Sequence, residues 1–181
     1  MPERARKDGV QWSREVEGLS IVADQVKNAV SLALDLFLTR EDSDDWLVID
    51  RSLLIATAAR DSMRNIYSKL DDARKRHLIA IALFELGDMS VLPDLIDAVE
   101  SDQQIFMLAA NKLASKSVKE AAPAILRRLE SSLGTDATVV ATLLRALSRL
   151  GNELPQRTYD VLKDNHFPEI QDALTSFRPK F

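Results

Sequence analysis

The stretch that decides the fold is ALFELGDMSVLPDLIDAV, residues 82–99. Apolar residues recur at helical spacing over Leu78–Leu86, which predicts a helix that ends there. Gly87 suits the left-handed residue that closes a helix, and Asp88 suits the turn that follows. Ser90 is the expected N-cap of a second helix. The apolar stripe of that helix consists of Val91, Leu92, Leu95, Ile96 and Val99. The stretch therefore predicts two helices joined by a short turn.

This helix ending recurs twice further along the chain. The three similar strings are Ala82–Asp88, Ala109–Ser115 and Ala146–Asn152. A proline follows each string, so that the prolines lie 30 and 32 residues apart, at Pro93, Pro123 and Pro155. One hairpin cannot bury its apolar stripes alone, and a period near 30 residues with two helices in each unit therefore predicts stacked helical hairpins.

The later units have the expected helices on both sides of their turns. First helices are predicted over Phe106–Leu113 and Val139–Leu150, and second helices over Val118–Leu129 and Pro155–Lys163. Ser117–Glu120 has the spacing of a capping box at the start of the second unit's second helix. Five leucines are expected in the core, where a change to alanine costs about 2–5 kcal/mol. They are Leu86, Leu95, Leu113, Leu126 and Leu147.

The string from Ala82 to Val99 resembles a HEAT-like repeat of the short type found in phycobilisome lyases and many bacterial proteins. The family pattern has Ala-Leu, Leu-Gly-Asp, a short turn and then Pro-x-Leu. The second unit departs from it, because Ala114 replaces the glycine and the loop to Pro123 is three residues longer. The resemblance covers about residues 73–165.

The resemblance implies an all-α fold, a right-handed α-α superhelix, or α-solenoid, of HEAT-like helical hairpins with an N-terminal helical cap. It also implies a role in holding partner proteins and, less often, lyase or other enzymatic activity. The alternative is an irregular helical bundle whose strings are similar by chance.

We expect one all-α domain over residues 1–181. Its parts are a polar tail (1–19), a helical hairpin cap (20–72), the repeats (73–165) and a C-terminal cap helix (166–181). The cap begins with a helix from Ser20 to about Thr39. Apolar residues then step by three and four from Trp46 to Leu70, which favours one helix over about 45–70. A break near Arg60-Asp61 is the alternative.

The acidic run Glu41–Asp45 does not match a calcium-binding loop. Counted from Asp42, the positions that need glycine and glutamate hold Leu47 and Leu53. The run is better explained as a helix start, with Asp44 or Asp45 as the N-cap.

Composition excludes several classes of site. The 181 residues contain no cysteine, which excludes disulfides, thiolate zinc sites and cysteine nucleophiles. The charged N-terminus has no apolar core, so we expect no secretory signal. The longest apolar stretch, Leu32–Leu38, is too short for a membrane span, and we expect a cytoplasmic protein without a membrane partner.

No motif for catalysis, a cofactor or a metal stands out. The two histidines are His77, expected to be solvated at a helix start, and His166, expected in a turn. The pair His166 and Glu169 has a ligand-like spacing, but the adjacent Pro168 favours a turn over a helical ligand pair. No Gly-rich phosphate loop and no supported Ser-His-Asp order occurs. We therefore predict that the protein is not an enzyme and needs no cofactor.

Charge predicts the partner surface. Residues 41–105 hold 14 acidic and 7 basic residues, and residues 106–181 hold 8 acidic and 11 basic residues. The second helices of stacked hairpins line one face, on which partners commonly bind. The predicted partner-binding residues are Asp94, Asp97, Glu100, Arg127, Arg128 and Arg157. This face would run from acidic to basic and orient a partner protein; the alternative is merely solvated helix faces.

The second hypothesis is a nucleic-acid-binding protein that uses a C-terminal basic stripe. The stripe would consist of Lys112, Lys116, Lys119, Arg127, Arg128, Arg145, Arg149 and Arg157. The net charge of −4 and the lack of interleaved aromatic residues make nucleic acid the less favoured partner. The third hypothesis is a lyase-type enzyme subunit.

Overall fold

The computed structural model describes residues 56–177 and four earlier positions, 25, 28, 29 and 32. Every regular element among these residues is a helix, and none is a strand. The expected all-α class is therefore confirmed for this part of the chain. The chain divides between Asp71 and Asp72 into two compact units, and each is described by itself.

In the N-terminal unit, α3 spans Ala56–Tyr67. The helix runs without interruption through Arg60 and Asp61, so the predicted alternative of a break there is wrong. Met63 is fully buried. The helix ends three residues before the predicted Leu70, because the chain turns after Tyr67.

Other predictions for this unit lie outside the described residues. They include the N-caps at Asp44 and Asp45 and the apolar positions Trp46, Ile49 and Leu53. The four isolated positions in the expected helix from Ser20 are helical or exposed where described: Gln25, Asn28, Ala29 and Leu32.

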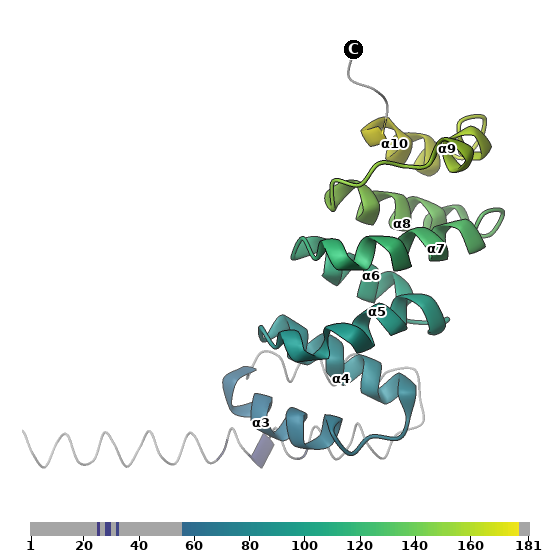
Figure 1. Cartoon of the computed structure of the whole chain (residues 1–181). Coiled ribbons are helices and arrows are strands. Elements are labelled where there is room, and N and C mark those ends of the chain that lie inside the picture. Colours follow the sequence, from purple (N-terminus) through teal and green to yellow (C-terminus); the bar gives the residue numbers. More distant parts are fainter. Residues whose placement is uncertain (1–24, 26–27, 30–31, 33–55, 178–181) are drawn as a thin grey trace, which may run out of the picture. The chain divides into compact units, whose positions relative to one another are not determined.

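The C-terminal unit is a succession of short helices (Figure 1). The seven α-helices are α4 (Ala73–Glu85), α5 (Leu92–Ser101), α6 (Phe106–Ser115), α7 (Ala122–Ser131), α8 (Ala137–Arg149), α9 (Gln156–Leu162) and α10 (Pro168–Leu174). Three 3-10 turns are η1 (Met89–Val91), η2 (Lys119–Ala121) and η3 (Thr175–Phe177). The predicted helices of the repeats and the C-terminal helix are all present.

These helices pack as stacked hairpins. α4 contacts α5, and α5 contacts both α6 and α7. The first helices of successive hairpins contact one another from α4 to α6, from α6 to α8 and from α8 to α10. Figure 1 shows the hairpins stacked one above the other in this order. Each hairpin thus covers the apolar side of the one before it.

The core follows most of the predicted apolar positions. Leu95, Leu113 and Leu147 are buried, as predicted. Leu86 and Leu126 are only half-buried, so their placement in the core was wrong. In α7 the buried side consists of Ala122, Ala124, Ile125 and Leu129, which turns Leu126 to the edge of that stripe.

Each first helix ends with a left-handed residue. These residues are Gly87 (φ 84°), Ser117 (φ 56°) and Gly151 (φ 72°). At each place the following residue's N–H reaches back to a carbonyl five residues earlier, as Val118 does to Leu113 at 3.0 Å. This is the Schellman pattern, which satisfies the last carbonyls of a helix.

These endings correct the predicted repeat register. Ser117, and not Ala114, is the counterpart of Gly87, and the two residues lie 30 positions apart. The loop from Ser117 to Pro123 then has the same length as the loop from Gly87 to Pro93. The apparent three-residue insertion in the second unit disappears.

The starts of the second helices also differ from prediction. The N-cap before η1 is Asp88, whose carboxylate accepts hydrogen bonds from the N–H and hydroxyl of Ser90 at 3.1 and 2.7 Å. Ser90 is therefore a donor here and not the cap. The predicted capping box of Ser117 and Glu120 is wrong, because Ser117 takes the left-handed conformation that ends α6.

Within the described ranges, no helix is both long and apolar enough to cross a membrane.

Candidate partner-binding face

The six predicted partner-binding residues lie on the second helices of three hairpins. Asp94, Asp97 and Glu100 are on α5, Arg127 and Arg128 on α7, and Arg157 on α9. We call the exposed side of these three helices the second-helix face. Every one of the six side chains contacts a neighbouring helix or loop, and these contacts determine what the face presents.

The first two acids of α5 bind basic groups of α4. Arg76 Nε lies 3.2 Å from an Asp94 carboxylate oxygen. His77 Nε2 lies 3.0 Å from Asp97 Oδ2. Asp97 also accepts a hydrogen bond from the Ser101 hydroxyl at 3.2 Å. The side chain of Asp97 stays 58% exposed, so it is held in place and still reaches solvent.

His77 is buried, contrary to the prediction of a solvated histidine. Its side chain is 3% exposed, between Asp97 on one ring nitrogen and Asp102 on the other, at 3.0 and 3.5 Å. The ring bridges two carboxylates that follow it by 20 and 25 residues in the sequence. Local sequence around Arg74–His77 gives no sign of partners at that distance.

Asp102 joins the first hairpin to the second. Burial by itself raises the pKa of this carboxyl, but hydrogen bonds from the backbone N–H groups of Gln104 and Ile105 and from His77 lower it. The net result is a pKa below the usual range of an aspartate. Asp102 is therefore a charged anchor for the turn that leads into α6.

Glu100 connects α5 to α7. Its carboxylate binds the Arg127 guanidinium, with the Arg127 Nε at 3.1 Å. Arg128 donates to the backbone carbonyl of Glu100 at 3.1 Å and to Gln103 at 2.8 Å. The Arg128 guanidinium also lies 4.1 Å from the centre of the Phe106 ring. Arg128 is thus half-buried and stapled to the first hairpin, and the prediction that it points outward is wrong.

The same kind of contact connects α7 to α9. Glu130 lies 3.6 Å from Arg157 and accepts a hydrogen bond from the buried Thr158 hydroxyl at 3.1 Å. In both pairs the arginine follows the glutamate by 27 residues, from Glu100 to Arg127 and from Glu130 to Arg157. This repeated spacing is the sequence signal that single-helix reasoning missed.

The second-helix face is consequently a ladder of paired charges. The predicted gradient from acidic to basic is replaced by alternation, because each exposed acid has a base beside it. The outer groups remain accessible, since the side chains of Arg127 and Arg157 are 63% and 86% exposed. Between the first two rungs lies a shallow cavity of about 220 Å³, lined by Glu100, Arg127, Arg128 and Ser131.

The basic residues of the alternative stripe do not gather on one surface. Lys112 pairs with Glu85 at 3.3 Å, and Lys116 donates to the carbonyls of Phe84 and Glu85 at the end of α4. Arg145 pairs with Asp172 of α10 at 3.0 Å. These groups neutralise or cap neighbouring first helices, while Arg127 and Arg157 lie on second helices.

The described residues include no group of three or more histidine or acidic side chains placed to hold a metal ion. His166 is exposed.

Comparisons with models of protein families, with curated proteins and with solved structures find no match to this chain.

Proposed function

We propose that the protein is a non-catalytic, cytoplasmic interaction module that binds another protein through the second-helix face. In this proposal the C-terminal unit is a HEAT-like α-solenoid whose hairpins wind in a right-handed superhelix. Its biological role is that of an adaptor, a regulator or an immunity-type protein that covers a partner surface.

One observation carries the proposal: three successive second helices are connected by ion pairs of the same design. The pairs Glu100–Arg127 and Glu130–Arg157 hold the side chains in fixed places on α5, α7 and α9. Groups that are already ordered lose little conformational entropy when a partner binds. A row of fixed, alternating charges supports selection of a partner with the complementary pattern.

A protein partner is favoured over nucleic acid by the same contacts. Binding to nucleic acid draws its affinity from cations that neutralise successive phosphates. On the second-helix face Arg127 and Arg157 each stand beside a glutamate, which lowers the positive potential that phosphates need. A partner protein with both signs of charge can match such a surface.

The test is a charge swap that keeps the ion pair. The double variant Glu100→Arg with Arg127→Glu reverses the order of charges on the face but preserves an attractive pair. The partner is isolated from native cells with the full-length protein as bait and is then purified. We expect the swap to weaken the partner's affinity about 10-fold or more, because opposite-sign contacts become like-sign contacts.

A matched control lies on the first helices. Arg145→Asp with Asp172→Arg swaps another exposed ion pair, between α8 and α10, whose sequence spacing is also 27 residues. Exposed pairs contribute about 0–1 kcal/mol to stability, so both double variants should melt close to wild type. The proposal fails if the Glu100–Arg127 swap leaves affinity unchanged, or if the control swap weakens binding equally.

A further inference from the structure

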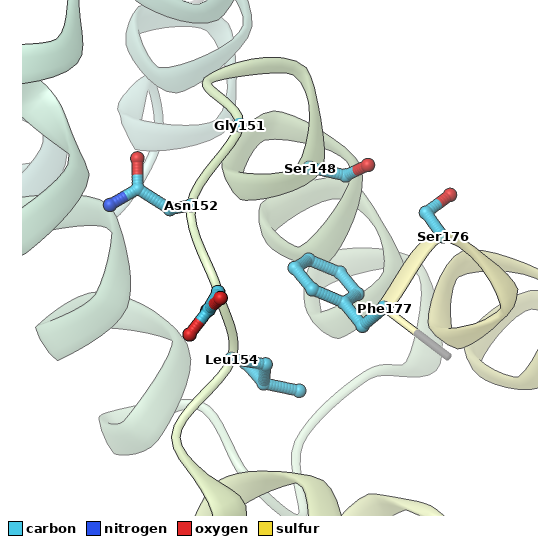
Figure 2. Close-up of a pocket in the computed structure, with 7 residues that line it drawn as sticks. Ser148, Gly151, Asn152, Leu154, Ser176 and Phe177 are labelled. Carbon is cyan, nitrogen blue, oxygen red and sulfur yellow. The ribbon is translucent and has the colours of Figure 1, made fainter. Parts of the chain in front are cut away.

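A cavity of about 490 Å³ lies at the far end of the hairpin stack, away from the second-helix face. Figure 2 shows it between the turn that follows α8 and the last residues of η3. The seven lining residues are Ser148, Gly151, Asn152, Glu153, Leu154, Ser176 and Phe177. None of them belongs to the proposed partner face, and none of the interactions described above uses this space.

The repeat shows what occupies the corresponding space elsewhere. The first helices α4 and α6 also end side by side, and Lys116 fills the gap between them. Its ammonium donates to the Phe84 carbonyl at 2.6 Å and to the Glu85 carbonyl at 3.1 Å, and lies 4.7 Å from the centre of the Phe84 ring. The end of α4 is therefore capped by a cation from the next hairpin.

The counterparts of these residues at the cavity are different in size. Counted from the left-handed residues Gly87 and Gly151, Ser148 stands where Phe84 stands in the first hairpin. The counterpart of Lys116 at the end of α10 is Thr175, at the start of η3. A small hydroxyl replaces the aromatic ring, and a short side chain replaces the lysine. The α8–α10 level thus has the same helix ends without the cation that fills the α4–α6 level.

The lining favours a cation on an apolar stem. Glu153 is the only charged residue among the seven. The C-terminal end of α8 adds the partial negative charge of a helix terminus. Leu154 points toward the Phe177 ring in Figure 2, so the two side chains offer an apolar wall and an aromatic surface. Aliphatic stems pack on apolar walls, and cations are attracted to aromatic faces.

We propose that this cavity binds the end of a lysine or arginine side chain. The ammonium or guanidinium group lies near Glu153 and the end of α8, and its stem packs between Leu154 and Phe177. A partner protein can supply this side chain. The chain's own sequence also holds two such residues, Arg178 and Lys180, directly after Phe177.

The test uses small cations as probes on the full-length protein. Butylammonium and butylguanidinium are titrated while the backbone amide NMR signals of the lining residues are followed, and butanol serves as the uncharged control. We expect saturable shifts with both cations at Ser148, Gly151 to Leu154, Ser176 and Phe177. Butanol should produce none that saturate.

Two single variants test the chemistry. Glu153→Gln should weaken cation binding about 5-fold, the effect of one partly exposed charge pair. Glu169→Gln removes an exposed acid of α10 that does not line the cavity, and it should leave the affinity unchanged. Equal binding of butanol, or unchanged binding in Glu153→Gln, would overturn the proposal.

The double variant Arg178→Ala with Lys180→Ala separates the two sources. Tighter probe binding than in wild type shows that the chain's own residues compete for the cavity, and unchanged affinity assigns the cavity to a partner's side chain. If this variant loses the binding seen in wild type, the probe site is not the cavity. The same conclusion follows if neither protein shows saturable binding.

Discussion

Ser117 is the only non-glycine residue with a positive φ in the part of the chain that the structure describes. A residue with a Cβ pays about 1–2 kcal/mol for the left-handed conformation. Glycine avoids that cost but loses about 0.5–1 kcal/mol more backbone entropy on folding. The change Ser117→Gly should therefore stabilise the protein by about 0.5–1 kcal/mol.

The counterpart of Ser117 in the first hairpin should respond with the opposite sign. A Cβ added at Gly87 meets no atom within 4 Å, so Gly87→Ala changes only the backbone energy. We expect a loss of about 1 kcal/mol. Ser115→Gly is the matched control, because this serine lies within α6, where glycine is about 0.5 kcal/mol less favourable than serine.

Urea unfolding followed by circular dichroism measures all three variants. The midpoint should rise for Ser117→Gly and fall for Gly87→Ala and Ser115→Gly, while the slope with denaturant stays constant. A lower midpoint for Ser117→Gly would refute the reasoning. It would mean that Ser117 does not occupy the place that Gly87 occupies in the first hairpin, and the 30-residue register would be wrong.

Other positions give further predictions. Leu113→Ala should cost about 2–5 kcal/mol, and Leu126→Ala clearly less because it is half-buried; calorimetry compares them. Lys116→Met should cost about 1 kcal/mol in urea unfolding, through loss of the cap on α4 and the cation-π contact. Since the folded pKa of Asp102 is lowered, its contribution to stability is present above the unfolded pKa and is lost as pH falls through the folded pKa. Asp102→Asn should therefore lower stability near neutral pH and flatten the acid limb of a stability curve.

The hairpins of the C-terminal unit could be predicted because their signals are local. Helical periodicity, Gly87 and Gly151, and the prolines after each turn act within a few residues of one another. The register of the second hairpin was wrong for an equally local reason. Ser117 takes the left-handed conformation without being glycine, so the string that ends in Ser115 was aligned in its place.

The contacts of the candidate face could not be predicted in the same way. His77 was expected in solvent because its neighbours are Arg74, Lys75 and Arg76, yet its partners come from α5 and the turn after it. Such pairs depend on how two helices are rotated against each other, which periodicity does not fix. The spacing of 27 residues between glutamate and arginine is the one feature that carries this information in the sequence.

The central claim is that a partner protein covers the second-helix face, and thiol footprinting tests it most directly. The sequence has no cysteine, so one introduced thiol reports on its own position. Arg157→Cys places it on α9 and Asp172→Cys on α10, where the native side chains are 86% and 73% exposed. With saturating partner, we predict that alkylation of Arg157→Cys slows about 10-fold or more while that of Asp172→Cys is unchanged. Unchanged alkylation of Arg157→Cys in the complex, or protection of Asp172→Cys alone, would contradict the claim.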